Sequence, residues 1–196
     1  TVFIPRRLGA NERRVAASPD TVKRRAGLGL GVVGEEGAGT ASRIPDEDFA
    51  KAGAAIGKAS DASKADVVLK VRRPTDAELK GYKPGAAVIA IMDPYGNDAA
   101  VAALAKAGVT AFSMEFMPRI TRAQSMDVLS SQANLAGYQA VIDAAAEYDR
   151  ALPMMMTAAG TVPAARVFVM GAGVAGLQAI ATARRLGAVV TATDVR

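Results

Sequence analysis

A glycine-rich turn constrains the fold of this chain more than any other stretch of it. Residues 167–170 form a short apolar run of strand type, glycine occupies the first, third and sixth positions of 171–176, and a helical pattern continues to Leu186. The first glycine permits a tight turn, the second lets the backbone approach a pyrophosphate, and the third lets helix and strand pack closely. The helix N-terminus offers free N–H groups and the positive end of a dipole to phosphates. This order of strand, turn and helix predicts a dinucleotide-binding site.

A second strand and an acidic residue complete the unit. Gly187 can end the helix, residues 188–193 form another strand-like run, and Asp194 follows it. Asp194 lies 18 residues after Gly176, close to the ~20 expected of a carboxylate that hydrogen-bonds ribose hydroxyls. Such a carboxylate repels a 2′-phosphate and favours NAD over NADP, whereas Arg196 is a residue that an NADP site would use. The predicted cofactor contacts are Gly171, Ala172, Gly173, Val174, Ala175, Gly176, Asp194, Val195 and Arg196.

The amino-acid composition excludes several kinds of catalytic chemistry. Neither histidine nor cysteine occurs among the 196 residues, so no imidazole base, histidine metal ligand or thiol is available, and we predict no metal site. The net charge is +5, but the basic residues come as scattered pairs with few aromatic residues between them, which argues against nucleic-acid binding. No apolar stretch approaches the ~20 residues of a membrane span, so we expect a soluble chain.

Strand-like and helical patterns alternate through the first 118 residues. Such alternation predicts a parallel sheet covered by helices on both sides. Ser18 and Pro19 predict a helix start, because serine is a good N-cap and proline suits the first helical position. The predicted strands are 2–4, 31–34, 67–71, 86–92 and 109–114, and the predicted helices are 18–27, 45–52, 60–65 and 97–106.

Residues 120–150 contain no helix breaker except Gly137 and predict one long helix. At about 100° per residue, polar side chains gather on one side of it and small or apolar ones on the other. The polar stripe is Gln124, Asp127, Ser131, Asn134 and Tyr138, and the opposite side carries Met126, Leu129, Ala133, Ala136 and Ala140. A solvated face and a face turned to a ligand or an interface both fit this pattern; the stripe lacks Lys and Glu and can make directed hydrogen bonds.

The predicted fold class is therefore α/β, with two Rossmann-like parallel-sheet domains joined by a long helix. We predict an N-terminal Rossmann-like domain over 1–120, a connecting helix over 121–150, and the first βαβ unit of an NAD-binding domain over 151–196. Residues 153–163 are expected to form a loop near the cofactor. A dinucleotide fold has roughly six strands, and the chain ends after the second of them, so we expect the second domain to be truncated at its C-terminus.

Several blocks of the sequence resemble one protein family. Residues 114–145, with the pattern RAQSMD-LSSQ-N-AGY inside them, and residues 156–188 closely resemble the NAD(H)-binding alpha component of proton-translocating nicotinamide nucleotide transhydrogenase. The resemblance extends to ERRVAASP at 12–19 and DVVLKVRRP at 66–74. These N-terminal motifs are also similar to those of alanine dehydrogenase, a more distant relative.

The resemblance implies a component that binds NAD or NADH and exchanges hydride directly with NADP(H) held on a partner component. A membrane proton-channel component would couple the exchange to proton movement. The implied localisation is cytoplasmic, peripheral on the inner face of a bacterial cell membrane, and the implied assembly is a homodimer. The implied nicotinamide-side residues are Arg119, Gln124, Asp127 and Ser130, with Gln124 holding the carboxamide and the other three forming a polar network beside the ring.

Two other functions remain open at this point. An alanine-dehydrogenase-like oxidoreductase would use Arg14 and Lys70, which match substrate-binding positions of that family, but its reaction moves a proton and resembles chemistry that uses a histidine. A non-catalytic NAD-binding module would bind the cofactor without hydride exchange. Direct hydride transfer needs no proton donor or acceptor, so the absence of histidine favours the transhydrogenase function.

Overall fold

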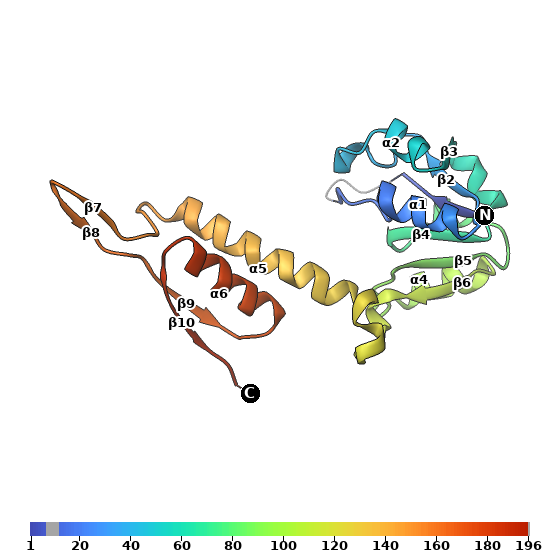
Figure 1. Cartoon of the computed structure of the whole chain (residues 1–196). Coiled ribbons are helices and arrows are strands. Elements are labelled where there is room, and N and C mark those ends of the chain that lie inside the picture. The colour runs from blue at the N-terminus through green and yellow to red at the C-terminus, as the bar shows by residue number, and fades with distance from the viewer. Residues whose placement is uncertain (7–11, 196) are drawn as a thin grey trace. The chain divides into compact units, whose positions relative to one another are not determined.

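The computed structural model describes residues 1–6 and 12–195, and the chain divides into two compact units, Thr1–Pro118 and Arg119–Arg196 (Figure 1). Each unit is described by itself. Within the described residues, no helix combines the length and apolar character needed to cross a bilayer.

A six-stranded parallel sheet forms the centre of the first unit. Its strand order is β3-β2-β1-β4-β5-β6, and every neighbouring pair is parallel. This is the order of a doubly wound Rossmann sheet, with the topological switch point between β1 and β4. The strands are β1 Val2–Ile4, β2 Val32–Glu35, β3 Ala54–Gly57, β4 Val67–Arg72, β5 Ala87–Ile91 and β6 Thr110–Ser113.

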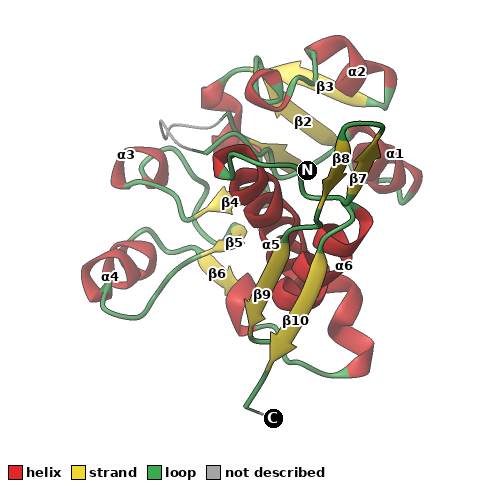
Figure 2. Cartoon of the chain, turned by 90° about the vertical axis from the view of Figure 1, so that its left-hand side faces the viewer, coloured by secondary structure: helices red, strands yellow, loops and turns green. Residues whose placement is uncertain are grey.

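The central strand β1 is buried on both faces, because helices cover the sheet on both sides (Figure 2). Phe3 packs on one face in a cluster that includes residues of α3 and α4, and Ile4 packs on the other with residues of α1 and α2. Successive side chains of a strand point to opposite faces, so an all-apolar strand is expected at this position. The helices are α1 Pro19–Gly27, α2 Asp46–Lys51, α3 Asp76–Leu79 and α4 Asp98–Lys106, and the 3-10 turns are η1 Thr40–Ser42, η2 Ala59–Lys64 and η3 Met114–Phe116.

The sequence predictions for this unit are confirmed in most elements. The N-cap of α1 is Ser18, whose hydroxyl accepts from the backbone N–H of Thr21 in a reciprocal capping box. Three elements differ from the prediction. The turn at 59–64 is a 3-10 turn rather than an α-helix, and neither β3 nor the short helix α3 was predicted. The strand β3 reads Ala-Ala-Ile-Gly, which carries little of the β-branched and aromatic content typical of strands.

The loop after β5 is held by charged side chains from two other segments. The Glu115 carboxylate accepts hydrogen bonds from the backbone N–H groups of Met92, at 3.0 Å, and of Asp93. The Arg73 guanidinium donates to the carbonyl oxygens of Met92 and Asp93 at 3.0 and 2.8 Å and to Asn97 Oδ1 at 3.0 Å. Asp93 has a positive φ of 46°, a conformation that costs energy in a non-glycine residue, and these bonds offset that cost.

Among its described residues, the second unit contains two α-helices, a short 3-10 turn, one parallel strand pair and one hairpin. Helix α6 follows the strand β9 and packs beside α5, and both helices lie on the same side of the β10-β9 pair (Figures 1 and 2). Val141, Ala165, Ala183 and Ala188 form its buried core. The elements are η4 Thr121–Met126, α5 Val128–Glu147, β7 Met155–Thr157, β8 Gly160–Val162, β9 Arg166–Met170, α6 Val174–Arg185 and β10 Val189–Thr193.

The helix predicted over 121–150 is shorter in the structure, and this prediction needs correction. Residues Thr121–Met126 form the separate 3-10 turn η4, and α5 begins only at Val128. Asp127 between them has extended backbone, with ψ at 97°, and its carboxylate caps α5. Asp competes well for N-cap positions because its side chain can bond the first free N–H groups. Because the helix is interrupted at Asp127, the residues before it do not continue the helical periodicity that the sequence pattern predicts from residue 120.

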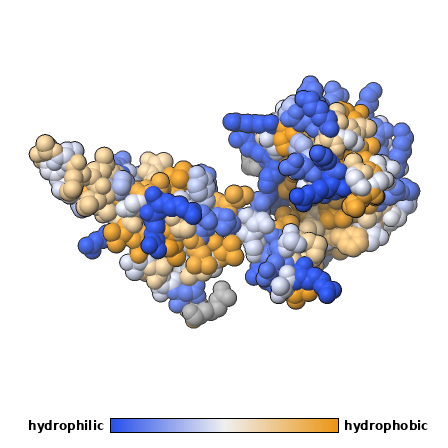
Figure 3. Space-filling model, in the orientation of Figure 1, coloured by the Kyte–Doolittle hydropathy of each residue, from blue (hydrophilic) through white to orange (hydrophobic). Residues whose placement is uncertain are grey.

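The predicted loop at 153–163 contains an antiparallel hairpin. Strand β7 pairs with β8 so that Met155 lies opposite Val162 and Thr157 lies opposite Gly160. Its apolar side chains are exposed, and pale orange marks this hairpin in the hydropathy surface (Figure 3). The exposed residues are Met154, Met155, Met156 and Val162.

Candidate functional site: a dinucleotide cleft in the second unit

The glycine turn after β9 has the geometry that its sequence predicts. Gly171 has a φ of +96°, a conformation that L side chains rarely adopt. A Cβ on Gly176 would lie 1.8 Å from the carbonyl oxygen of Gly171, so only glycine fits there. A Cβ on Gly173 would meet nothing within 4 Å, which leaves open space beside the backbone at the N-terminus of α6. The turn can therefore receive a pyrophosphate against free N–H groups.

Asp194 ties the end of β10 to this turn. Its Oδ2 accepts a hydrogen bond from the backbone N–H of Ala172 at 2.5 Å. The preceding residues of the two segments are bonded as well: the N–H of Gly171 donates to the carbonyl oxygen of Thr193 at 2.8 Å. The carboxylate predicted to contact a ribose is thus fixed directly beside the residues predicted to contact the pyrophosphate.

A second polar group forms at the start of α5. The Asp127 carboxylate accepts from the N–H groups of Leu129 and Ser130 at 2.9 and 3.0 Å, and the Ser130 hydroxyl donates to it at 2.7 Å. These bonds to Ser130 lower the pKa of Asp127 below its ordinary value, and the nearby positive charge of Arg119 lowers it further. Asp127 is therefore an ionised acceptor at neutral pH, and its orientation is fixed by the helix cap.

Replacing Ser130 with alanine should raise the pKa of Asp127 toward its ordinary value. The hydroxyl that now stabilises the charged carboxylate is lost, while the two backbone N–H bonds remain. The side-chain carboxyl chemical shift of Asp127, followed by NMR as pH falls, measures this change directly. Ser131→Ala is the matched control, because the Ser131 hydroxyl donates to the backbone carbonyl of Asp127 instead of its carboxylate. Equal titration curves for wild type and the Ser130 variant would contradict the assigned cause.

The two groups line a common open cleft. Its volume is about 910 Å³, and it lies entirely within the second unit. Arg119 and Ser130 line it together with Asp194 and all six residues of the turn. The lining residues are Arg119, Leu129, Ser130, Ala133, Met170, Gly171, Ala172, Gly173, Val174, Ala175, Gly176, Leu177 and Asp194.

Other predicted residues lie less close to the cleft. Asp127 joins it through its bonds to Ser130. Gln124 is exposed in the turn η4 and is not part of the cleft lining among the described residues. Val195 is fully exposed and also lies outside the lining, and Arg196 lies outside the described residues. The conformation of Gln124 and the position of Val195 therefore lend no support to their predicted roles.

Sequence reasoning missed the apolar wall of the cleft. Leu129 and Ala133 line it beside Ser130, although the helical projection placed both on the side away from the polar stripe. Of that stripe, Asn134 donates a hydrogen bond to Gln178 of α6 at 3.2 Å, and Ser131 and Tyr138 are exposed. The projection placed Leu129 and Ala133 correctly on a common face, since residues four apart are neighbours on a helix. It did not show that this face, instead of the polar stripe, lines the cleft.

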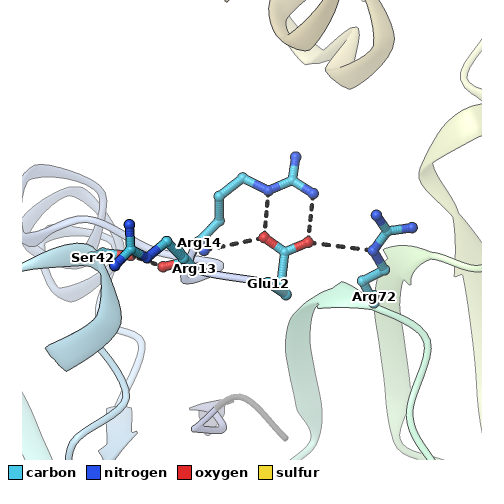
Figure 4. Close-up of polar contacts among 5 residues, drawn as sticks. All are labelled: Glu12, Arg13, Arg14, Ser42 and Arg72. Carbon is cyan, nitrogen blue, oxygen red and sulfur yellow. Dashed lines mark hydrogen bonds and ion pairs between the residues drawn. The ribbon is translucent and has the colours of Figure 1, made fainter. Parts of the chain in front are cut away.

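The positions matching alanine dehydrogenase are paired with carboxylates in the first unit. Arg14 makes a bidentate contact to Glu12, with Nε–Oε1 at 2.7 Å and Nη2–Oε2 at 2.6 Å, and Arg72 Nε lies 3.3 Å from the same carboxylate (Figure 4). Lys70 forms an ion pair with Glu78, and both side chains are largely buried. These contacts give Arg14 and Lys70 internal partners that contribute to the fold of this unit.

We expect Glu12→Gln to destabilise the first unit at neutral pH and to destabilise it clearly less near pH 3, where part of the contribution of the carboxylate has already been lost. The hydrogen bonds from Arg14 lower the pKa of Glu12 from 4.5 to about 2. A carboxylate with a lowered pKa in the folded state stabilises the fold above its ordinary pKa and loses this contribution as pH falls from 4.5 towards 2. Because Arg14 and Arg72 are partly solvated, the expected loss at pH 7 is about 1–2 kcal/mol. Urea unfolding at pH 7 and pH 3 measures it, and an equal difference at both pH values would refute the pairing.

Within the described residues, no group of three or more acidic side chains is placed to hold a metal ion. The features that remain define a class. The second unit combines a parallel β-turn-α-β unit, a glycine turn at a helix N-terminus, an acidic residue at the tip of the second strand and an adjoining cleft. This combination is typical of a dinucleotide-binding α/β protein.

Comparison with known proteins places the chain within a family. Residues 3–136 match the N-terminal domain of the alanine dehydrogenase/PNT family, and residues 140–196 match its C-terminal domain. The chain therefore belongs to this family.

The individual relatives include both transhydrogenases and alanine dehydrogenases. An NAD(P) transhydrogenase alpha subunit of Rhodospirillum rubrum is 56% identical over all of this chain and 53% of that protein. The solved structure of transhydrogenase from Sinorhizobium meliloti is 72% identical with a TM-score of 0.97, over all of this chain and 56% of that one. Alanine dehydrogenase of Mycolicibacterium smegmatis is 31% identical over 99% of this chain and 53% of that protein. The chain spans about half the length of the curated relatives it matches.

Proposed function

We propose that this chain belongs to the NAD(H)-binding alpha component of a proton-translocating NAD(P) transhydrogenase. In this proposal, NAD or NADH bound to the chain exchanges hydride directly with NADP(H) held on a partner component. The observation that carries it is the cleft in which Arg119 and Ser130 join the glycine turn and Asp194. Relatives at 44–56% identity that are named as subunit alpha of this enzyme support the same function.

The residues present fit a dinucleotide. The turn residues 171–176 and the N-terminus of α6 would hold the pyrophosphate, since the space beside Gly173 is open. Asp194 would accept hydrogen bonds from the ribose of the adenosine half, and its charge would disfavour a 2′-phosphate. The specificity for NAD on this component and NADP on its partner is included in the proposal.

The opposite end of the cleft would receive the nicotinamide. A nicotinamide ring supplies or accepts the hydride, and the protein has to position the ring and exclude water. Arg119 and Ser130 supply hydrogen-bond donors, and Asp127 holds Ser130 in place through two of its hydrogen bonds. Gln124, in the turn η4, would hold the carboxamide. None of these steps needs an acid or base with a pKa near 7, in agreement with a chain that has no histidine.

The partners and location follow from the same proposal. The chain would work beside an NADP(H)-binding component and a membrane proton-channel component, as a cytoplasmic, peripheral element of the bacterial cell membrane system. The proposed assembly of the alpha component is a homodimer, which analytical ultracentrifugation of the complete polypeptide would test.

The proposed function predicts hydride exchange between the two nucleotides. The complete polypeptide carrying this chain is mixed with its NADP(H)-binding partner, NADPH and an NAD analogue with a distinct absorbance when reduced. Reduction of the analogue is expected, and omission of the partner should abolish it. NAD binding without exchange would identify a binding module instead, and NADH oxidation with pyruvate and ammonia would identify an alanine dehydrogenase.

A further inference from the structure

The two helices that flank the cleft touch at one glycine. Gly137 of α5 is buried against the backbone of α6, and a Cβ there would lie 2.1 Å from the carbonyl oxygen of Ala175 and 3.0 Å from its Cα. These are main-chain atoms in the first turn of α6, which cannot rotate aside as a flexible side chain would. The approach of the two helices at this point therefore depends on the absence of a side chain at Gly137.

The contact lies directly behind the cleft. Ala175 belongs to the glycine turn and lines the cleft. Ser130 lies seven residues before Gly137 on α5, which is two helical turns, or about 10 Å, along nearly the same face. One straight helix thus carries the polar group around Asp127 and Ser130 at its N-terminus and, two turns later, meets the turn that would hold the pyrophosphate.

Further contacts along the same face hold this geometry. The amide of Asn134, between Ser130 and Gly137, donates a hydrogen bond to Gln178 Oε1 at 3.2 Å. One turn beyond Gly137, Val141 is buried in the core with Ala183 of α6. The helices are thus fixed by a hydrogen bond, a close backbone approach and an apolar contact in succession.

We propose that Gly137 is a positioning residue that sets the distance between the nicotinamide-side residues of α5 and the pyrophosphate turn of α6. Gly137 is not among the described residues that line the cleft, so its role is to place other residues. The inference rests on the proposed function, because the distance matters only if one dinucleotide spans both sites. The pyrophosphate turn and Asp194 move together, since Ala172 and Gly171 are bonded to the end of β10.

The variant Gly137→Ala of the complete polypeptide tests this inference when its affinities for a whole dinucleotide and for a part of that dinucleotide are compared. Calorimetry would measure the dissociation constants of NADH, which spans both sites, and of ADP-ribose, which lacks the nicotinamide. A misplacement approaching 1 Å between the two sites should weaken NADH binding about 10-fold and change ADP-ribose binding by less than about 3-fold. Helix propensity alone favours alanine over glycine, so a weaker complex would arise from the helix contact.

A second variant keeps the test independent of folding. Asn134→Ala removes the hydrogen bond to Gln178 without adding volume, and it should weaken NADH binding in the same selective way by about 2–3-fold. Gln139→Ala is the matched control, because its side chain bonds to Asp143 on the exposed side of α5, and both ligands should bind to it as to wild type.

The outcomes separate the two proposals. Selective loss of NADH affinity in the Gly137 and Asn134 variants supports the positioning role. Unchanged NADH affinity in both variants, or equal loss of NADH and ADP-ribose, overturns the positioning role and leaves the proposed function standing. A wild-type protein that binds neither ligand overturns the proposed function and the inference together.

Discussion

Gly176→Ala should lower the affinity of the complete polypeptide for NADH at least about 100-fold, because the displaced turn would lose hydrogen bonds to the charged pyrophosphate, each worth about 1.5–3 kcal/mol. The new Cβ would stand 1.8 Å from the carbonyl oxygen of Gly171 and 2.8 Å from its carbonyl carbon. Both are backbone atoms, so strand β9 and helix α6 must separate. Overpacking of this kind also costs about 2 kcal/mol of folding stability. Calorimetric titration with NADH and urea unfolding measure the two effects.

Two other glycines supply the controls. Gly173→Ala meets no protein atom within 4 Å, so the fold should be retained, while a methyl group in the open space beside the turn should obstruct the pyrophosphate. Gly27→Ala, at the end of α1 in the first unit, also meets nothing within 4 Å and should alter neither property of the cleft. Wild-type NADH binding by the Gly176 variant would contradict the proposed site.

Asp194→Ala should weaken NADH binding by about 30- to 100-fold and reduce the preference for NADH over NADPH. The substitution removes the ribose acceptor, and it also leaves the N–H of Ala172 without its 2.5 Å bond to the carboxylate. An unmade hydrogen bond to a charged group costs about 2–3 kcal/mol. Fluorescence titration with NADH and NADPH in parallel gives both affinities.

Asp194→Asn separates the charge from the hydrogen bond. Asparagine retains an oxygen that can accept from Ala172 but carries no charge to repel a 2′-phosphate. This variant should keep most of the NADH affinity and gain affinity for NADPH. If both variants kept the wild-type preference for NADH, Asp194 would have no role in selecting the nucleotide.

The sequence predicts those regions of the fold in which local pattern and tertiary packing agree. β1, β4, β5 and β9 are short apolar runs between breakers, and each is a strand in the structure. Strand β3 and the hairpin β7–β8 escape prediction for a common reason. Alanine and glycine make up most of β3 and have weak strand propensity, and β7 and β8 are only three residues long each. In each case, pairing with a neighbouring strand determines the conformation.

In the candidate site, too, the sequence predicts the part that depends on a local motif and not the part that depends on packing between elements. The glycine turn and Asp194 are bonded to each other over 22 residues of sequence, and a local motif is sufficient to predict that arrangement. The sequence pattern groups Leu129 and Ala133 on one face of α5, but packing against α6 decides that this face lines the cleft. Periodicity within one helix carries no information about which face meets a neighbouring element. It also gives no sign of the break at Asp127, before which Gln124 lies in a separate turn.

The bonds around the loop after β5 have a consequence for exchange with solvent water. The amides of Met92 and Asp93 both donate to the Glu115 carboxylate, and Arg73 fixes the two carbonyl oxygens. Deuterium should therefore replace their protons as slowly as it does in the adjoining strand, although the loop has no regular structure. Tyr95 stands 82% exposed at this loop, with its ring 5.5 Å from that of Phe116. The first unit thus presents an aromatic pair to solvent on a loop that side-chain hydrogen bonds hold in place.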